Sequence, residues 1–336
     1  MKYYSLVASS ECLGSNEVHK LLLGNDWSVI TLRKNYGDIF DGKDYCLNLN
    51  RLSMFTLIIP FLKLYLYVPS GSRLLADGIF PMIVAKLLAF FKRDVSIVML
   101  VHNDYSINNR TRWKFIPNVL FDFLYRMILV RSKIVTTSDA ALKALQLLGY
   151  HNVTCINNVV VPARVYEDRV NEFPVFWFIG RLVSAKRVCD IIESARQRPE
   201  VIFNIVGNGE EFETLVNSAP GNVVFKGFVE EPFQLVSIGD VFMLPSSVEG
   251  RSLALLKAAS AGMLLIVSDI PENNFISSVN GVYFHRVCDV SGILHAVDTI
   301  CSLDAVARMQ MGLENKSSID KTLDVRKFKQ AYKDAF

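Results

Sequence analysis

Two cations follow an apolar run in the second half of the chain. The run VFWFIG ends in Gly180, Arg181 comes next, and Lys186 stands five residues further on. Ligands of α/β proteins bind where parallel strands end, so residues directly after a strand are the first candidates for a site. A pair of cations at such a strand end favours a diphosphate. The alternative is a solvated turn whose charges face water.

A candidate helix follows the run VFMLP. A carboxylate comes just before this helix, and a lysine lies within it. In SSVEGRSLALLKAASAG, 246–262, Glu249 lies in the loop, and Lys257 is the only charge in the apolar helix that Gly262 stops. Free amides at the start of such a helix suit a phosphate. Glu249 is suited to accept hydrogen bonds from sugar hydroxyls or to cap the helix, and the sequence leaves both roles open.

Two other strand-end loops carry weaker signals. In IVGNGE, Gly207 and Gly209 predict a tight turn into a helix, and the acids that follow argue against an anion there. We therefore assign this loop mainly to structure. In NVVFKGFVEEP, 222–232, exposed backbone at Phe228 and Val229 is suited to the edge of a base.

The elements that must position these loops alternate along the whole chain. Apolar runs rich in Val, Ile and Phe alternate with helical patterns, as in parallel sheets buried between helices. The pattern pauses at 161–174, which we interpret as a linker between two doubly wound α/β domains. We expect an N-terminal domain over 1–165, a second over 172–320, and a charged amphipathic helix over 321–336 that crosses back to the first.

The stretch 52–70 is the most apolar segment and the one candidate for a membrane span. Pro60 and Lys63 interrupt it, and both are costly in the middle of a lipid-embedded helix. We expect instead a helix that ends near Lys63, followed by LYLYV, 64–68, as a buried strand.

Composition limits the class of protein. The 336 residues are 51% hydrophobic with a formal charge of +3, so neither disorder nor a nucleic-acid-binding surface is indicated. The six cysteines stand singly, without metal-ligand spacing, which fits free thiols in a reducing cytoplasm. The N-terminus lacks the apolar length of a secretory signal. We expect a cytoplasmic protein with no bound metal.

Taken in order, the second-half motifs resemble those of a known family. GRLVSAK, IVGNGE, VVFKGFV, DVFMLPSSVEGRSLALLKAASAG and LLIVSDIPEN are similar to the donor-binding domain of the retaining GT-B glycosyltransferases of family 4, the glycosyl transferases group 1. The first half agrees through GSNEVHKLLL, MLVHN, TTSDAALKAL and CINNVV. This resemblance implies two Rossmann-like domains facing a central cleft, and transfer of a sugar from a nucleotide-diphosphate donor with retention of configuration and without a metal or cofactor.

The resemblance also implies roles for residues of the second half. Arg181 and Lys186 would neutralise the donor diphosphate, including the charge that grows as the glycosidic bond breaks. Glu249 would hold hydroxyls of the donor sugar, and Val229 with its neighbour Phe228 would contact the base. The backbone after Gly250, around Ser252 and Leu253, would contact phosphate.

In the first half, the resemblance implies three further site residues. His102, which ends MLVH, would approach the donor sugar and complete the catalytic set of Arg181, Lys186 and Glu249. A hydrogen-bonded structural histidine is the alternative for His102. Gly14 and Ser15 would lie near phosphate and acceptor.

Lys257 departs from the family pattern. The family has a glutamate at this position, eight residues after the first, and that carboxylate usually binds the ribose. A lysine cannot accept those hydrogen bonds, so we expect Lys257 to pair with an acid such as Glu249 or Glu272, or to reach a donor phosphate. The departure keeps a second hypothesis open, a catalytically impaired scaffold subunit. An epimerase or phosphorylase of the same fold has less support, because its catalytic groups cannot be placed in the sequence.

The acceptor and the location are the least determined. The resemblance implies a UDP- or GDP-linked sugar as donor and a saccharide or lipid-linked saccharide as acceptor, as in surface polysaccharide synthesis. Residues 110–133 alternate cations with aromatic and aliphatic residues. This pattern fits a helix resting on the anionic inner face of the cytoplasmic membrane, and equally an ordinary core helix with basic ends.

Overall fold

The chain folds into two units. The computed structural model describes residues 2–9, 14–24, 26–33, 44–47, 58–102, 118–162 and 170–336. The first unit is Met1–Asn158 together with Val325–Phe336, and the second is Val159–Asp324. The chain therefore passes between the units twice.

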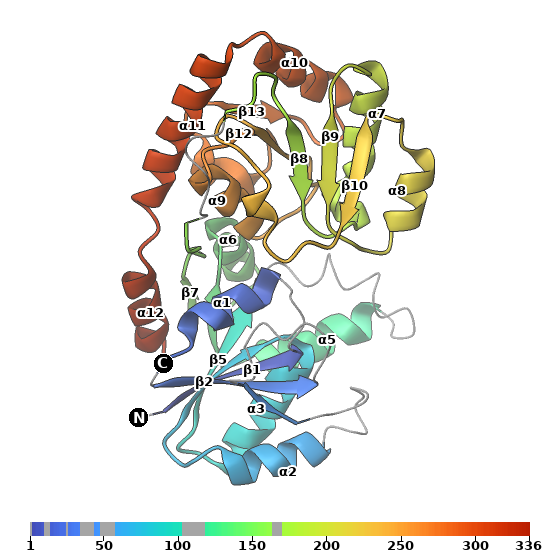
Figure 1. Cartoon of the computed structure of the whole chain (residues 1–336). Helices are drawn as coiled ribbons and strands as arrows, with labels where there is room; N and C mark the ends of the chain where they lie inside the picture. Colours follow the sequence, from blue (N-terminus) through green and yellow to red (C-terminus); the bar gives the residue numbers. More distant parts are fainter. Residues whose placement is uncertain are drawn as a thin grey trace. The chain divides into compact units, whose positions relative to one another are not determined.

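The first unit is built on a parallel sheet of seven strands in the order β3-β2-β1-β4-β5-β6-β7 (Figure 1). The strands are β1 Tyr3–Ser9, β2 Trp27–Arg33, β3 Asp44–Cys46, β4 Arg73–Asp77, β5 Ser96–Val101, β6 Lys133–Thr136 and β7 Val153–Cys155. The order reverses between β1 and β4, so the connections after these two strands leave in opposite directions. Such a switch point is where doubly wound folds bind ligands.

Six helices of the first unit lie within the described residues. They are α1 Gly14–Leu22, α2 Ile58–Tyr67, α3 Ile79–Phe91, α5 Asn118–Leu129, α6 Asp139–Leu147 and the C-terminal α12 Val325–Asp334. The helix expected in TTSDAALKAL is α6, and the hydroxyl of Ser138 caps it by accepting a hydrogen bond from the Ala141 amide at 3.2 Å.

The second unit repeats this plan with a parallel sheet of six strands in the order β10-β9-β8-β11-β12-β13. The strands are β8 Phe176–Ile179, β9 Phe203–Val206, β10 Val223–Gly227, β11 Val241–Leu244, β12 Leu264–Ser268 and β13 Val282–His285. The α-helices are α7 Val188–Gln197, α8 Phe212–Ser218, α9 Leu253–Ser260, α10 Val290–Cys301 and α11 Ala305–Asp320, and 3₁₀ turns include Ser184–Lys186 and Pro271–Ile276. The switch point here lies between β8 and β11.

The strand β8 illustrates why these runs are continuously apolar. Phe176 and Phe178 join the core beneath α7 and α10, whereas Trp177 and Ile179 join the core beneath α9. Both faces of the strand are thus buried, as expected of a sheet covered by helices on two sides. The predicted α/β class with two doubly wound parallel sheets is confirmed.

The prediction for residues 64–68 is wrong. LYLYV continues α2 up to Tyr67, and the buried strand that follows is β4, RLLAD. Pro60 falls in the first turn of α2, where a proline is tolerated, so it does not end the helix. Only Leu64 and Val68 of the five residues are buried, which is the spacing of one helical face.

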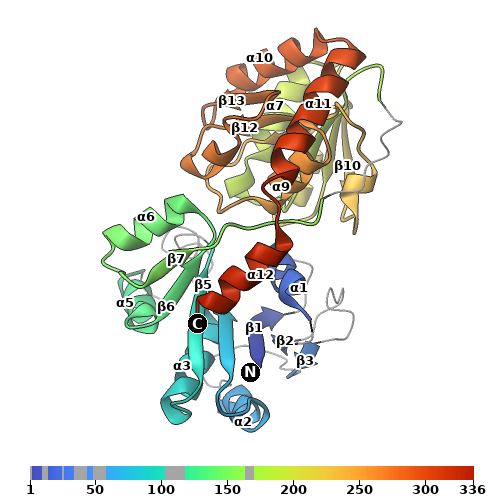
Figure 2. The same cartoon turned by 90° about the vertical axis from the view of Figure 1, so that its left-hand side faces the viewer.

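The C-terminal helix α12 packs on the first unit, alongside α1 (Figure 2). Phe328 and Tyr332 are buried there, and the rings of Tyr332 and Trp27 lie edge to face at 6.5 Å. Arg73 of β4 donates a hydrogen bond to the backbone oxygen of Lys333 at 3.3 Å. The last helix of the chain thus belongs to the first unit.

Within the described residues, no individual helix combines the length and the apolar character needed to cross a membrane. By length and composition alone, one pair of helices bent by 114°, Val290–Cys301 with Ala305–Asp334, meets that requirement.

Candidate functional site

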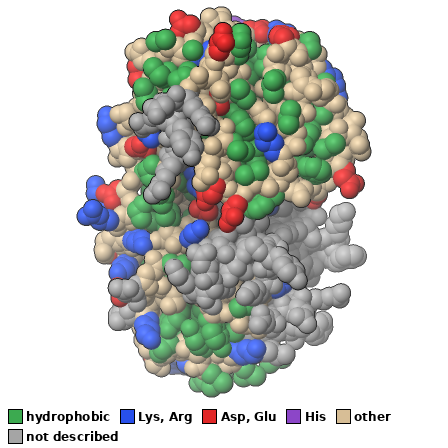
Figure 3. Space-filling view, viewed as in Figure 1, with side chains coloured by type: hydrophobic (Ala, Val, Ile, Leu, Met, Phe, Trp, Pro, Cys, Tyr) green, Lys and Arg blue, Asp and Glu red, His purple; other side chains and the backbone are tan. Residues whose placement is uncertain are grey.

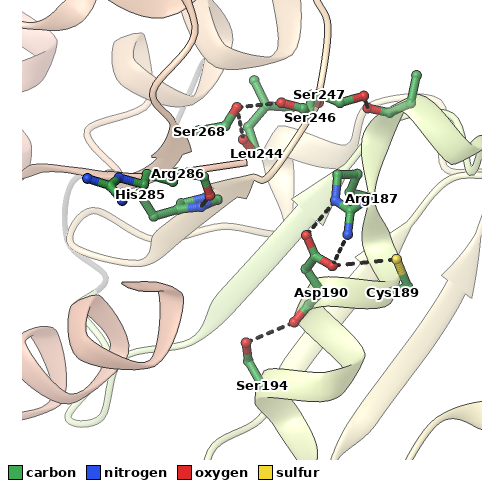
Figure 4. Close-up of polar contacts among 11 residues, drawn as sticks. Arg187, Cys189, Asp190, Ser194, Leu244, Ser246, Ser247, Ser268, His285 and Arg286 are labelled. Carbon is green, nitrogen blue, oxygen red and sulfur yellow. Dashed lines mark hydrogen bonds and ion pairs between the residues drawn. The ribbon is translucent and has the colours of Figure 1, made fainter. Parts of the chain in front are cut away.

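The loops after β8 and β11 meet at the switch point of the second sheet. The amide of Ser247 donates to the backbone oxygen of Ala185 at 2.8 Å, and the Ser247 hydroxyl donates to the same oxygen at 3.2 Å (Figure 4). The hydroxyl of Ser268 donates to the backbone oxygen of Ser246. The two Ser247 bonds fix the loop after β11 against the 3₁₀ turn Ser184–Lys186, and the Ser268 bond ties the same loop to the end of β12.

An ion pair joins the two loops. The ammonium of Lys186 donates a hydrogen bond to Oε1 of Glu249, and only 19% and 8% of these side chains are exposed. The sequence predicted a role for each residue separately, and the structure brings them together. A half-buried ion pair of this kind holds one cation and one carboxylate in a fixed place at the edge of the sheet.

Glu249 does not cap the following helix. The N-cap of α9 is Ser252, whose hydroxyl accepts a hydrogen bond from the Leu255 amide at 3.3 Å, and the helix begins at Leu253. Gly250 lies between the ion pair and this cap. The capping role that the sequence left open for Glu249 is therefore excluded, and its carboxylate instead meets Lys186.

Arg181 supplies a second cation. It follows Gly180 at the end of β8, and its side chain is exposed. Within the described residues its guanidinium has no hydrogen-bonding or ionic partner, unlike Lys186 and Arg187. A planar, permanently charged and exposed group at the end of β8 is suited to a phosphate.

Two glycines allow the loop after β9 to support the loop after β8. A Cβ on Gly207 would lie 1.8 Å from the backbone oxygen of Gly180, and a Cβ on Gly209 would lie 2.2 Å from that of Leu182. Only glycine permits these approaches, so the structural role predicted for this GxG is confirmed. The loop that carries Arg181 rests directly on these glycines.

Arg187 is a third cation nearby, and sequence reasoning missed it. Its guanidinium donates two hydrogen bonds of 2.7 Å to the two carboxylate oxygens of Asp190, as Figure 4 shows. Arg187 has a left-handed backbone (φ 50°) and precedes the first residue of α7. The spacing of an arginine and an aspartate three apart at a helix start was the available signal. The Arg187 guanidinium is therefore paired with Asp190 at the start of α7.

A further carboxyl lies close to the ion pair. Glu272 lies in the first turn of the 3₁₀ segment Pro271–Ile276 after β12, and burial together with the charge of Glu249 raises its pKa. Lys257 lies half-buried in the last turn of α9. The expected pairing of Lys257 with an acid or a phosphate stays a prediction.

The residues proposed to contact a base follow β10. Gly227 adopts a left-handed turn (φ 64°), Phe228 is 61% exposed, and Val229 packs against the core of the second unit. An exposed aromatic ring beside anchored backbone is suited to stacking on a base.

In the first unit, His102 belongs to a cluster of three buried or half-buried groups. His102 follows β5, Asp77 ends β4, and His19 lies on α1. The Nε2 atoms of both histidines lie 3.0 Å from Oδ2 of Asp77. The carboxylate raises the pKa of His102 against the opposing effect of burial, and the histidines hold the pKa of Asp77 below its usual range.

The predicted site residues therefore fall into two groups. Arg181, Lys186, Phe228, Val229, Glu249, Gly250, Ser252, Leu253 and Lys257 belong to the second unit, and His102, Gly14 and Ser15 belong to the first. Gly14 begins α1 and Ser15 follows it, and the side chain of Ser15 lies outside the described part of the structure. Among the described residues, no three His, Cys, Asp or Glu side chains are grouped to hold a metal ion.

Comparison with known proteins bears on both units. Residues 173–302 match the family model for glycosyl transferases group 1. The chain is 27% identical over 174 residues to an Escherichia coli UDP-Gal:alpha-D-GlcNAc-diphosphoundecaprenol alpha-1,3-galactosyltransferase, covering 48% of this chain and 45% of that protein. It is 27% identical over 156 residues to the lipopolysaccharide core biosynthesis glycosyltransferase LpsE of Rhizobium meliloti, covering 44% and 46%. The chain thus matches about half the length of these relatives.

The fold as a whole matches a solved structure. A crystal structure of HepE from Anabaena in complex with UDP and glucose superposes with a TM-score of 0.82, covering 99% of this chain and 98% of that one at 14% identity. At that identity, the likeness concerns the fold: both units of this chain have the GT-B architecture.

Proposed function

Because this chain belongs, through residues 173–302, to the glycosyl transferases group 1 family, we propose that it transfers a sugar from a nucleotide-diphosphate donor to a saccharide or lipid-linked saccharide. The observation that carries the proposal is the Lys186–Glu249 pair beside the exposed Arg181 at the switch point of the second sheet. The family supports retention of anomeric configuration in this transfer.

The chemistry follows from the charges at this edge of the sheet. Cleavage of the donor's glycosidic bond places an additional negative charge on the leaving diphosphate. Lys186, which Glu249 holds in place, and the exposed Arg181 are cations that stabilise this charge as it develops, which lowers the barrier more than it tightens ground-state binding. Glu249 orients Lys186 and offers its carboxylate to hydroxyls of the donor sugar.

We favour a UDP-linked donor and a lipid-linked acceptor. The Escherichia coli relative is named for UDP-Gal and a diphosphoundecaprenol acceptor, and the HepE structure contains UDP and glucose. Both are properties of those proteins, and they guide the choice of substrates here. Phe228 beside Val229 would provide the surface for the uracil ring.

The test is turnover of a panel of UDP- and GDP-linked sugars by wild type and by Arg181→Ala and Glu249→Ala. Loss of one preorganised charge at a reacting group costs on the order of 100-fold in kcat. Arg196→Ala is the matched control, since Arg196 lies in the same unit but forms an exposed ion pair with Glu193. Wild-type turnover in both site variants would refute the assigned roles.

The scaffold hypothesis rests on Lys257 alone. Calorimetric titration with UDP and GDP distinguishes it, because a scaffold without donor chemistry has no need to bind either. Absence of binding to both nucleotides, together with no turnover of any donor, would favour the scaffold over the transferase.

We also propose that the protein works at the cytoplasmic face of a membrane, through an apolar surface of the first unit. Leu62 and Leu66 of α2 and Leu87, Phe90 and Phe91 of α3 are exposed, and we call these five residues the α2–α3 patch. Helices α2 and α3 lie side by side, the rings of Phe61 and Phe91 being 5.3 Å apart.

Cations border this patch. Lys63, Lys92 and Arg93 neighbour its residues in the sequence, and the ammonium of Lys92 sits 4.7 Å from the centre of the Tyr65 ring. Figure 3 shows apolar side chains gathered with Lys and Arg on this end of the first unit. Apolar groups ringed by cations suit an interface of anionic lipid. Of the segment 110–133, residues 110–117 lie outside the described residues, so the α2–α3 patch now carries this proposal.

A further inference from the structure

One carboxylate oxygen of Asp77 lies within hydrogen-bonding distance of two histidines. Its Oδ2 lies 3.0 Å from Nε2 of His19 and 3.0 Å from Nε2 of His102. An ionised carboxylate only accepts hydrogen bonds, so both histidines must carry their proton on Nε2. Nδ1 is then the nitrogen of His102 that remains for another partner.

The two histidines differ in their access to solvent. The side chain of His19 is fully buried, and within the described residues its Nδ1 has no hydrogen-bond partner. An unpaired lone pair is cheaper to bury than an unpaired N–H group, so a neutral ring with its proton on Nε2 fits this site. The side chain of His102 is 20% exposed. A second proton held by the cluster therefore resides on Nδ1 of His102.

We propose that Asp77 is a positioning residue that orients the His102 ring through Nε2 and keeps Nδ1 of His102 a hydrogen-bond donor toward a substrate oxygen at the carboxyl end of the first sheet. The inference rests on the proposed function and deepens it. It names a carboxylate, outside the motifs singled out in the sequence, that fixes which nitrogen of His102 is free to meet a substrate.

The titratable groups described around the cluster come from α1, α12 and β7. His19 faces Asp77 from α1, and Tyr332 of α12 lies near enough for the charge of Asp77, after burial, to raise its pKa. Cys155, at the end of β7, is the second group that raises the pKa of Tyr332, after Asp77. Asp77 is the carboxylate that favours the charged form of His102.

A pH-rate profile tests the proposal. A protonated Nδ1 is lost as the pH rises through the pKa of His102, so kcat/KM with the preferred UDP sugar should fall on the alkaline side. In Asp77→Asn the amide oxygen still accepts from Nε2, but the charge is gone. The pH of half-maximal activity on that side should then move down by roughly one pH unit or more. Asp139→Asn, the same change at an exposed position of the first unit, should leave the profile in place.

Imidazole NMR of the protein without substrate gives a second readout. His102→Gln assigns the His102 signals among those of the five histidines. Wild type should show His102 protonated on Nε2 when neutral and titrating above its ordinary pKa, and Asp77→Asn should lower that midpoint. The wild-type tautomer stands as a test even where Asp77→Asn does not fold.

The outcomes separate this inference from the proposed function. Coupled titration by NMR without turnover of any sugar nucleotide would refute the transferase, and with it the substrate role of Nδ1. Turnover with an unchanged alkaline limb in Asp77→Asn, or a wild-type His102 protonated on Nδ1 when neutral, would overturn the role of Asp77 alone. If Asp77 acts through His102, Asp77→Asn/His102→Gln should be within about twofold of His102→Gln in kcat/KM.

Discussion

At the scale of the residue, Lys257 is the substitution with the sharpest consequence for the donor. An ammonium donates hydrogen bonds but cannot accept them from ribose hydroxyls. Lys257→Glu restores the acceptor that the family pattern has, so we expect the Kd for UDP to change by roughly 10-fold, the equivalent of one charged hydrogen bond. Calorimetric titration with UDP and GDP measures this.

The matched control is Lys321→Glu, which makes the same charge change at an exposed position of the second unit. Its nucleotide affinities should equal those of wild type. Identical affinities for Lys257→Glu and wild type with every nucleotide would show that the side chain merely extends into solvent.

The sequence predicted single site residues better than their partners. Arg181, Lys186 and Glu249 each follow an apolar strand, and a strand end is visible in one stretch of sequence. The partners Lys186 and Glu249 are 63 positions apart, and only the adjacency of β8 and β11 brings them together. The residues of the Asp77 cluster come from three separate elements, so no local spacing in the sequence predicts the cluster.

At the scale of the element, the loop after β9 determines the position of the loop that carries Arg181. Gly209→Ala would drive a Cβ to within 2.2 Å of the Leu182 backbone oxygen, and neither backbone can move without moving Arg181. We expect a loss of about 2–4 kcal/mol, or roughly 4–16 °C in Tm for a domain of this size. Donor affinity should fall with it.

Gly221→Ala is the control for this change, because an added Cβ there would meet no atom within 4 Å. Scanning calorimetry compares the two variants with wild type. Equal Tm values for Gly209→Ala and Gly221→Ala would contradict the close approach.

The sequence distinguished helix from strand well where strands are long and buried on both faces. It failed at 64–68, because LYLYV has the aromatic and branched composition of a strand although it forms the exposed end of a helix. The strand β4, RLLAD, has only three apolar residues between charges, and only its pairing with β1 and β5 in the centre of the sheet makes it a strand.

At the scale of the whole molecule, the first unit takes its last helix from the end of the chain. Residues 325–336 return after the whole second unit has been completed, and Lys333 of α12 forms an ion pair with Asp26 at 3.1 Å. Phe336 lies against Tyr3 with ring centres 5.7 Å apart. The chain therefore connects the two units at two places. The Asp77 cluster lies in the first unit, which is complete only when its C-terminal helix has been added.

The α2–α3 patch on the surface of that unit predicts that the whole protein binds anionic membranes. We expect wild type to float with liposomes containing anionic lipid at low salt, because the α2–α3 patch offers apolar side chains for insertion and cations for the headgroups. Leu66→Glu/Phe90→Glu places two carboxylates on the patch and should abolish flotation. Leu147→Glu is the control, since Leu147 is 89% exposed on α6, outside the patch, and its variant should float like wild type. Recovery of wild type in the unbound fraction, or equal flotation of Leu66→Glu/Phe90→Glu, would remove the membrane from the proposal and leave soluble saccharides as the acceptors to be tested.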